Sequence, residues 1–265
     1  MKQKKWPFVY VGLVTAVTYV PILLTVVYSF NESKISSVWG GFSLKWYEEL
    51  IRDRDLREAL VNSLILAGLT CLCAVVIGTM GAVGMHRKKT RLGDVMATAS
   101  MLPIMIPEII LGMVFLSVFS LMDLPFGMLT LVIAHTAFSI PYVYSMVSTR
   151  LMGMDKSLEE AALDLGATPF RVFWDVTFPA ILPGILSGVM LAFAMSFDDV
   201  VISIFVTGPA VNTLPVKIYT KLKTGVTPEI NALATVILLV TVLLLALSAV
   251  IGRWRRPAEG QGADR

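Results

Sequence analysis

The sequence has 265 residues, of which 56% are hydrophobic and 15% are charged. A soluble domain carries about 25% charged residues. The low charge and a mean hydropathy of +0.76 place the chain among membrane proteins and disfavour a soluble enzyme or a nucleic-acid-binding protein. The formal net charge of +3 decides little, because the position of each charge along the chain matters more than the sum.

Six apolar stretches are long enough to cross a bilayer as helices, which takes about 20 residues each. The expected spans cover residues 7–30, 61–85, 95–122, 125–149, 179–206 and 230–252. Pro103 and Pro107 interrupt the third stretch, where proline disturbs a helix. The pattern lacks the alternation of a membrane barrel, so it predicts an all-α integral membrane protein with one domain over residues 1–256.

Basic residues near the span ends predict the orientation. They gather at three places, which six spans put on one side: Lys2, Lys4 and Lys5; Arg87, Lys88, Lys89 and Arg91; Arg253, Arg255 and Arg256. We therefore expect both termini in the cytoplasm, together with the connection 150–178. The first apolar run is too long for a cleaved signal peptide. The tail 257–265 is small and polar, and we expect it to be a disordered cytoplasmic segment.

The segment 154–179 is a polar, amphipathic island between the fourth and fifth spans. Ser157 and Glu160 have the spacing of a capping box. The helix that they predict would end at Gly166. Its apolar side would consist of Leu158, Ala161, Ala162 and Leu165.

A second short helix is predicted after Thr168, with Pro169 in its first position. Its apolar stripe would hold Phe170, Phe173, Trp174 and Thr177. On these residues alone the island has two interpretations. It is either an interfacial connector between two spans or a rigid cytoplasmic element that docks into another protein.

The triplet Glu160-Ala161-Ala162, Gly166 downstream and Phe178-Pro179 at the end resemble the coupling signature of ABC importer permeases. Val176 and Phe178 stand where isoleucine and leucine are usual in that signature. The resemblance implies the type I ABC importer permease fold. It also implies that Glu160, Ala161, Ala162 and Gly166 form the contact with an ATP-hydrolysing subunit.

Further segments are similar to the permeases of spermidine/putrescine importers, among them residues 41–47, 196–199, 206–209, 214–219 and 227–235. This likeness implies a polyamine as the transported solute and the bacterial inner membrane as the location. It also implies three partners: a second, similar permease chain, a cytoplasmic ATPase dimer that holds ATP and Mg²⁺, and an external solute-binding protein.

The sequence predicts that this chain is not an enzyme and binds no cofactor or metal itself. A phosphate-binding loop needs Gly-x-x-x-x-Gly-Lys-Ser/Thr, and the sequence contains no Gly-Lys pair. His135 is interpreted as a packed or hydrogen-bonded helix residue. Cys71 and Cys73 are two positions apart in an apolar helix, do not face each other, and are interpreted as packing residues. Gly184 and Gly188 predict close packing of the fifth span.

Three acids stand inside or at the end of apolar stretches: Glu108, Asp198 and Asp199. Acids within spans are rare and commonly face a water-filled path. At 1.5 Å per residue, Glu108 lies about 20 Å and Asp198 about 28 Å along its span. The alternative is that Asp198 and Asp199 only mark the end of the span. We expect all three acids to line a substrate path.

Other functions remain open from the residues alone. The chain could serve an importer of another small solute, or it could be a secondary transporter driven by an ion gradient. A secondary transporter commonly shows an inverted repeat, which is not evident here, and has no need of a docking island. A membrane enzyme is disfavoured, because no motif marks an activated serine.

Overall fold

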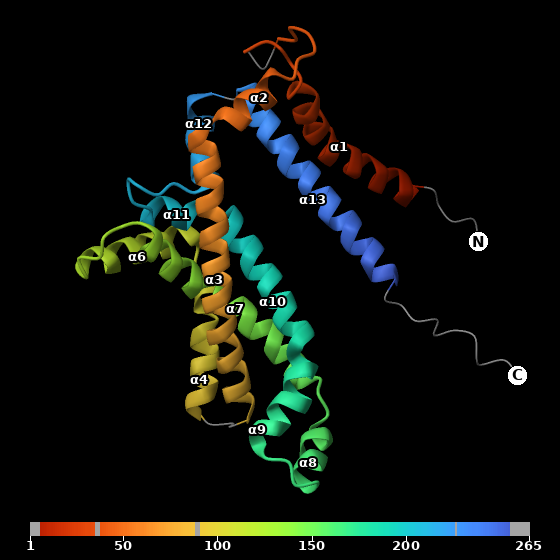
Figure 1. The fold of residues 1–265 in the computed structure, drawn as a ribbon, viewed down its shortest axis with the longest axis vertical. Coiled ribbons are helices and arrows are strands. Elements are labelled where there is room, and N and C mark those ends of the chain that lie inside the picture. The colour runs from red at the N-terminus through yellow and green to blue at the C-terminus, as the bar shows by residue number, and fades with distance from the viewer. Residues whose placement is uncertain (1–5, 35–37, 88–90, 226, 255–265) are drawn as a thin grey trace, which may run out of the picture. The chain divides into compact units, whose positions relative to one another are not determined.

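The computed structural model describes residues 6–34, 38–87, 91–225 and 227–254 (Figure 1). Every regular element in this part of the chain is helical, apart from one isolated antiparallel bridge between Asn31 and Phe42. The chain divides into two compact units, residues 1–54 with 220–265, and residues 55–219. The single domain expected over residues 1–256 stays a prediction, and the expected disordered tail lies outside the described residues.

The first unit contains the long helices α1 (Trp6–Tyr28) and α13 (Pro228–Trp254) and the short helix α2 (Lys45–Arg52). Helix α13 packs against both α1 and α2. The loop between α1 and α2 folds around the buried Asn31. Its side-chain nitrogen donates to the carbonyl of Val38 at 2.7 Å, and its side-chain oxygen accepts from the backbone of Gly40 at 2.7 Å.

The second unit holds the remaining helices. They are α3 (Arg54–Arg87), α4 (Arg91–Ser100), α5 (Leu102–Met105), α6 (Glu108–Leu121), α7 (Met128–Met152), α8 (Lys156–Asp164), α9 (Pro169–Val172), the π-helix η1 (Phe173–Thr177), α10 (Phe178–Asp198) and α11 (Val201–Val206). Helix α12 (Leu214–Thr224) begins in this unit and ends in the first.

Two apolar cores stabilise the second unit. One core joins α3, α7 and α10 around Val143, Val147 and Ile181, all of which are fully buried. The other core joins α3, α6, α7 and α11 and includes Leu66 and Leu131. Helix α7 contributes to both cores and is therefore the central element of this unit.

Close approach between α7 and α10 depends on glycine. A Cβ atom at Gly188 would lie 3.2 Å from Cα of Val143, and one at Gly184 would lie 2.9 Å from the carbonyl oxygen of Met146. Both distances are shorter than ordinary van der Waals contacts, so a larger residue would separate the helices. The predicted close packing of the fifth span at these glycines is confirmed.

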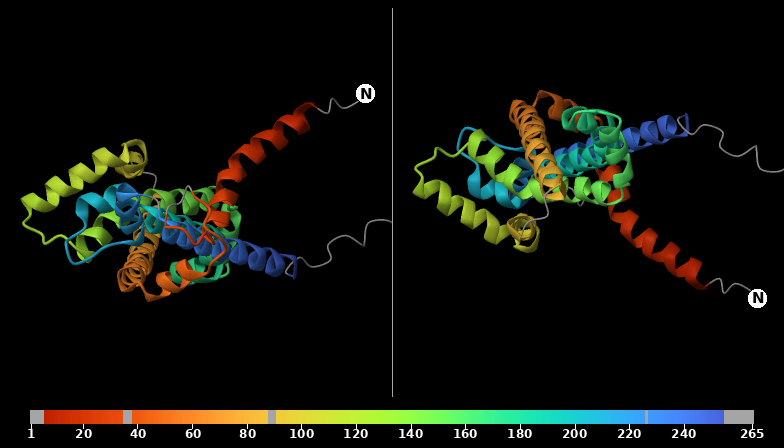
Figure 2. Two further views of the ribbon diagram at one scale, coloured as in Figure 1. Left: turned by 90° about the horizontal axis from the view of Figure 1, so that it is seen from above. Right: turned by 90° about the horizontal axis from the view of Figure 1, so that it is seen from below.

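Four described helices are long and apolar enough to cross a membrane: Phe8–Tyr28, Arg54–His86, Met128–Met152 and Pro169–Asp198. The expected third span is a broken one, because Val95–Met105 and Glu108–Leu121 meet at 108°. In Figure 2, which looks along the long axis, α6 accordingly lies across the view. The expected sixth span corresponds to α13, whose apolar part is described over Pro228–Leu243. The six continuous spans that we expected are thus confirmed only in part.

The local backbone explains why the expected third and fifth spans are interrupted. Ile106 precedes Pro107 and is extended, with ψ 131°, as the ring of a following proline demands. The expected fifth span 179–206 does not continue past Asp198, because Asp199 is also extended, with ψ 125°. The chain then restarts as the separate helix α11.

The loop after α11 is anchored to the start of α3. Asn62 donates from its side-chain nitrogen to the carbonyl of Asn212 at 3.1 Å, and the hydroxyl of Ser63 accepts from the backbone of Leu214 at 2.8 Å. These bonds connect positions about 150 residues apart in the sequence. They define the geometry of the segment that leads from α11 to α12.

Candidate functional site

The polar island folds as α8, a glycine turn, α9 and η1, and it leads directly into α10. Helix α8 begins earlier than expected. Its N-cap is Asp155, whose carboxylate accepts from the backbone nitrogen of Ser157 at 3.0 Å. This hydrogen bond lowers the pKa of Asp155 below its ordinary value. The capping box predicted from Ser157 and Glu160 is therefore wrong, because both residues lie inside the helix.

Gly166 ends α8, as predicted. Its φ of +84° is left-handed, a conformation that costs other residues energy because of their Cβ atom. The backbone nitrogen of Gly166 donates to Leu163 at 2.9 Å, and that of Ala167 donates to Ala162 at 3.1 Å. These two bonds form the Schellman motif, which satisfies the last carbonyls of the helix and turns the chain sharply.

The restart after the turn also agrees with the prediction. Thr168 is the N-cap of α9, and its hydroxyl accepts from the backbone of Arg171 at 3.4 Å. Pro169 occupies the first helical position. The predicted stripe of the second helix is only partly packed, since Thr177 is buried whereas Phe170 is 72% exposed.

One side of the island is not covered by any of the described residues. Leu158 and Leu165 are exposed, Leu165 by 88%, and Ala161 between them is exposed as well. Glu160 and Gly166 are exposed, and Ala162 is half-buried. The four predicted contact residues thus lie together on α8 and its turn, where another protein can reach them. An exposed apolar surface of this kind is typical of an interaction site.

Glu159 is a residue of the island that the sequence did not single out. The hydroxyl of Thr177, in η1, donates a hydrogen bond to the Glu159 carboxylate. Thr177 is 1% exposed, so the bond ties α8 to the beginning of α10. The sequence signal was weak, because Glu159 stands beside Glu160 and no spacing rule connects it with a residue 18 positions away.

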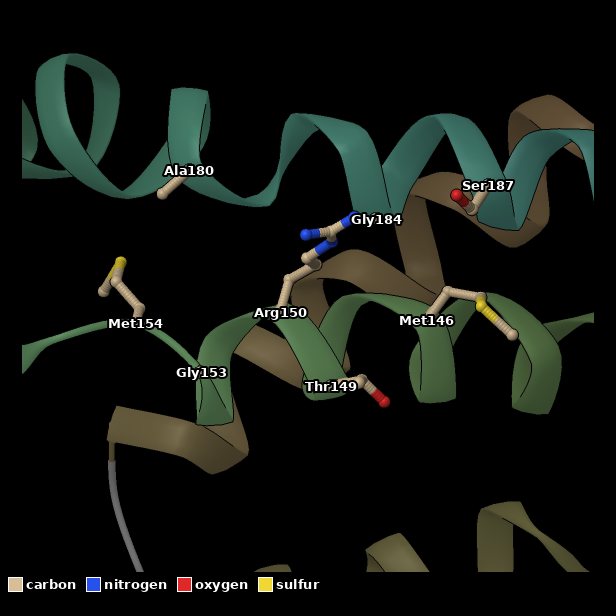
Figure 3. Close-up of a pocket in the computed structure, with 8 residues that line it drawn as sticks. All are labelled: Met146, Thr149, Arg150, Gly153, Met154, Ala180, Gly184 and Ser187. Atoms are coloured by element: carbon tan, nitrogen blue, oxygen red, sulfur yellow. The ribbon is translucent and has the colours of Figure 1, made fainter. Parts of the chain in front are cut away.

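A pocket of about 440 Å³ lies next to the island, between the end of α7 and the start of α10 (Figure 3). The Arg150 side chain reaches between the two helices toward Gly184. A Cβ atom at Gly184 would lie 2.7 Å from Cγ of this arginine, so glycine leaves the space for it. The pocket presents a cation, which would repel a cationic solute.

The three predicted path acids have different surroundings. Glu108 is exposed at the first turn of α6, immediately after the 108° bend. Asp198 is exposed at the last residue of α10. Asp199 is only 9% exposed. Its carboxylate accepts from the backbone nitrogens of Ile202 at 3.3 Å and Ser203 at 2.8 Å, which caps the first turn of α11.

Asp199 belongs to a buried polar cluster around His135, whose side chain is fully buried. Nδ1 of His135 lies 2.9 Å from the hydroxyl of Ser196, and Nε2 lies 3.0 Å from the hydroxyl of Ser203. Nε2 is also 3.4 Å from Oδ2 of Asp199. The expectation that His135 is a packed, hydrogen-bonded helix residue is confirmed. Its partners could not be predicted, because they stand 61 to 68 positions away.

Ser196, His135 and Asp199 are the three residue types of the catalytic triad of a serine hydrolase, and the histidine lies between the other two. A nucleophilic serine must meet a substrate carbonyl. Ser196 is 3% exposed within α10, so no substrate carbonyl reaches its hydroxyl in this arrangement. The cluster is therefore interpreted as a bond between helices and not as a catalytic triad.

Comparisons with known proteins agree with this geometry. Residues 74–258 match the family model described as "Binding-protein-dependent transport system inner membrane component". The chain is 42% identical to the putrescine transport system permease protein PotI of Escherichia coli K12, over 89% of this chain and 86% of that protein. It is 37% identical to the spermidine/putrescine transport system permease protein PotC of the same strain, over 91% and 93%.

Solved structures show the same fold at low sequence identity. A chain of a bacterial ABC transporter that imports the acidic polysaccharide alginate aligns with a TM-score of 0.69 at 13% identity, and the alignment covers 94% of this chain and 95% of that one. A chain of the MetNI methionine ABC transporter aligns with a TM-score of 0.59 at 18% identity, over 81% and 100%.

Proposed function

Because the chain belongs to the family of binding-protein-dependent transport system inner membrane components, we propose that it forms half of the path through which an ABC importer moves spermidine or putrescine. The observation that supports a polyamine as the substrate is the sequence identity with PotI and PotC over about nine-tenths of the chain. The other half of the path would be a second, similar permease chain. ATP and Mg²⁺ would be held by a separate ATPase dimer, and an external binding protein would deliver the polyamine.

In this proposal the chain crosses the inner membrane several times with both termini in the cytoplasm. The basic residues at the termini and after the second span support that orientation. It puts the exposed side of α8 on the side where ATP is hydrolysed. It also puts the bend before Glu108 and the end of α10 toward the outside.

The island would couple ATP hydrolysis to transport. The exposed Ala161 and the half-buried Ala162 would offer a small surface that fits into a cleft of the ATPase, while Glu160 and Gly166 flank it. ATP would close the ATPase dimer, the island would transmit this motion to α10, and the path would open outward. The direct passage from η1 into α10 supports this role, because no flexible linker separates the docking surface from the span.

The acids would compensate the charge of the polyamine. A polycation that enters the membrane loses hydration, and carboxylates along the path offset that loss. Glu108 and Asp198 are exposed and would contact the ammonium groups. Asp199 would support the path from behind Asp198, since its oxygens already accept two backbone hydrogen bonds.

Uptake of labelled spermidine by the assembled importer tests the acids. Glu108→Gln and Asp198→Asn should each raise the apparent KM about tenfold, the effect of losing about 1.4 kcal/mol of binding. Glu48→Gln, which removes an exposed acid of α2, is the control and should leave KM unchanged. Unchanged KM and rate in both path variants would show that these acids do not meet the substrate.

A second assay separates the proposed substrate and energy source from their alternatives. Proteoliposomes with the complete importer and its external binding protein should accumulate spermidine or putrescine only when ATP is supplied. An amino acid and a sugar serve as competing solutes and should not reduce the uptake. Uptake driven by an ion gradient without ATP would favour a secondary transporter. Inhibition of polyamine uptake by the amino acid or the sugar would show that the importer accepts that other solute.

A further inference from the structure

The cluster around His135 lies where α7, α10 and α11 meet. Each of the three helices contributes at least one member: His135 from α7, Ser196 from α10 and Ser203 from α11. Every member is at most 9% exposed, Asp199 included. Buried polar groups of this kind are costly unless they are paired, and here both ring nitrogens of the histidine have partners.

The hydrogen positions follow from the partners. Asp199 accepts from two backbone nitrogens, and a carboxylate offers acceptors only. Nε2 of His135 lies 3.4 Å from this carboxylate and 3.0 Å from the hydroxyl of Ser203, and we therefore assign a hydrogen to Nε2. In this assignment the Ser203 hydroxyl accepts from Nε2, and the Ser196 hydroxyl lies 2.9 Å from the other ring nitrogen. The tautomer with hydrogen on Nε2 is thus set by residues of α11 and of the junction before it.

The cluster fixes the place where α10 ends. Asp199 is the extended residue between α10 and α11, and His135 holds its side chain from α7. Asp198 is the preceding residue and is exposed. Asp198 is the last residue of α10, so the position of its side chain depends on where Asp199 ends that helix.

We propose that His135 is a positioning residue of the transport path: through Asp199 it fixes the junction of α10 and α11, and so directs the carboxylate of Asp198 toward an ammonium group of the polyamine. This inference rests on the proposed function of Asp198. It assigns different tasks to two adjacent acids. Asp198 contacts the solute, while Asp199 and His135 hold Asp198 in place.

The first test observes His135 directly. The chain has two histidines, so ¹⁵N-histidine labelling of the purified importer, with the other subunits unlabelled, gives two sets of ring signals, and His86→Gln assigns them. The His135 signals should show hydrogen on Nε2, and Asp199→Asn should change the Nε2 signal. Hydrogen on Nδ1 alone would overturn the assignment, because Asp199 would then have no donor from the ring.

The second test asks whether the cluster acts through Asp198. Ser196→Ala removes the partner of Nδ1 and Asp199→Asn removes the charge at Nε2. Ser139→Ala is the matched control, since Ser139 is a fully buried serine of α7 whose hydroxyl has no hydrogen-bond partner among the described residues. Each variant is made alone and together with Asp198→Asn, and spermidine uptake is measured in complexes that assemble.

Ser196→Ala and Asp199→Asn should raise the apparent KM about five- to tenfold in the natural background, as the loss of one hydrogen bond to a charged group would. In the Asp198→Asn background they should leave KM unchanged, and Ser139→Ala should do so in both. Additive effects would overturn the positioning role and leave the path acids intact. An Asp198→Asn variant with unchanged KM would overturn the path proposal, and with it the role of His135.

Discussion

At the scale of single residues, Gly166 decides how the coupling segment ends. Its left-handed backbone has open space around it, so the requirement for glycine comes from conformation and not from crowding. Gly166→Ala should cost about 1 kcal/mol locally and loosen the turn. We expect faster hydrogen exchange at Ala167 and more ATP hydrolysed per solute transported.

Gly153 provides the matched control for this substitution. It lies before α8 with φ −86°, a conformation that alanine adopts freely, and its Cβ would have ordinary contacts at 3.7 Å. Gly153→Ala should therefore leave exchange and coupling unchanged. If both variants behave alike, the left-handed conformation is not what the coupling segment requires.

The sequence predicted the end of α8 better than its start. A glycine after an amphipathic stretch has one common meaning, whereas Asp155 and Ser157 both cap helices well. Only the folded chain shows which of the two side chains meets a free backbone nitrogen. The partners of His135 were out of reach for another reason, because they depend on the packing of three helices.

At the scale of elements, the bond between Thr177 and Glu159 joins α8 to η1. Glu159→Gln and Thr177→Val should both weaken it, and amide exchange in α8 should become faster. Glu160→Gln, which alters an exposed neighbour, should leave that exchange unchanged. Hydrogen exchange with mass spectrometry on the assembled importer measures the difference.

A second measurement distinguishes residues that stabilise the fold of α8 from residues that contact the ATPase. Glu160→Gln should reduce the ATPase rate that the loaded binding protein stimulates, because Glu160 is proposed to touch the ATPase. Faster exchange in α8 after Glu160→Gln, with no change after Glu159→Gln, would reverse the roles of the two glutamates.

The breaks between elements were partly visible in the sequence. Pro107 predicted an interruption of the third apolar stretch, yet hydropathy alone could not give the 108° bend. The break at Asp199 was only an alternative in the sequence, because apolar residues continue on both sides of the two aspartates. Its cause is the capping of α11 by the Asp199 side chain, which is a local choice that periodicity does not record.

At the scale of the whole chain, Lys221 joins segments that are 168 positions apart. Its ammonium group lies 2.9 Å from Asp53 and 3.0 Å from Glu229. Burial alone would lower the pKa of Lys221, but the hydrogen bonds and charges of these two carboxylates raise it above the ordinary value. The charged form is therefore stabilised by folding.

The sign of the pH dependence follows. Stability from a raised lysine pKa is fully present below the unfolded value of about 10.4 and is lost as pH rises through the folded value. Lys221→Gln should lower the melting temperature at pH 8, and the difference from the natural protein should shrink above pH ~10.5. Thermal unfolding of the purified importer between pH 8 and 11 measures it.

Lys217→Gln is the comparison for this prediction. Lys217 pairs with Asp55, which is 71% exposed, and exposed ion pairs contribute little. Its loss should lower the melting temperature less than the loss of Lys221. A difference for Lys221→Gln that stays constant up to pH 11 would contradict the role of its charge.

The general architecture was accessible from composition and signature residues, whereas the pairing of distant segments was not. Among the described residues, the expected third span is bent, which hydropathy alone did not show, because hydropathy counts apolar residues and ignores where the backbone bends.

The π-helix η1 has a consequence for the rotational phase between the docking surface and the membrane span. A π-turn holds one residue more than an α-turn, and each residue of an α-helix advances the chain by about 100°. Both kinds of turn complete about one rotation, so deleting one residue from Phe173–Thr177 would leave an α-turn and nearly the same orientation of α8. Deleting one residue from α10 would instead rotate the docking surface by about 100° relative to the rest of that span. Such a protein would keep every contact residue of the island and present them in the wrong direction.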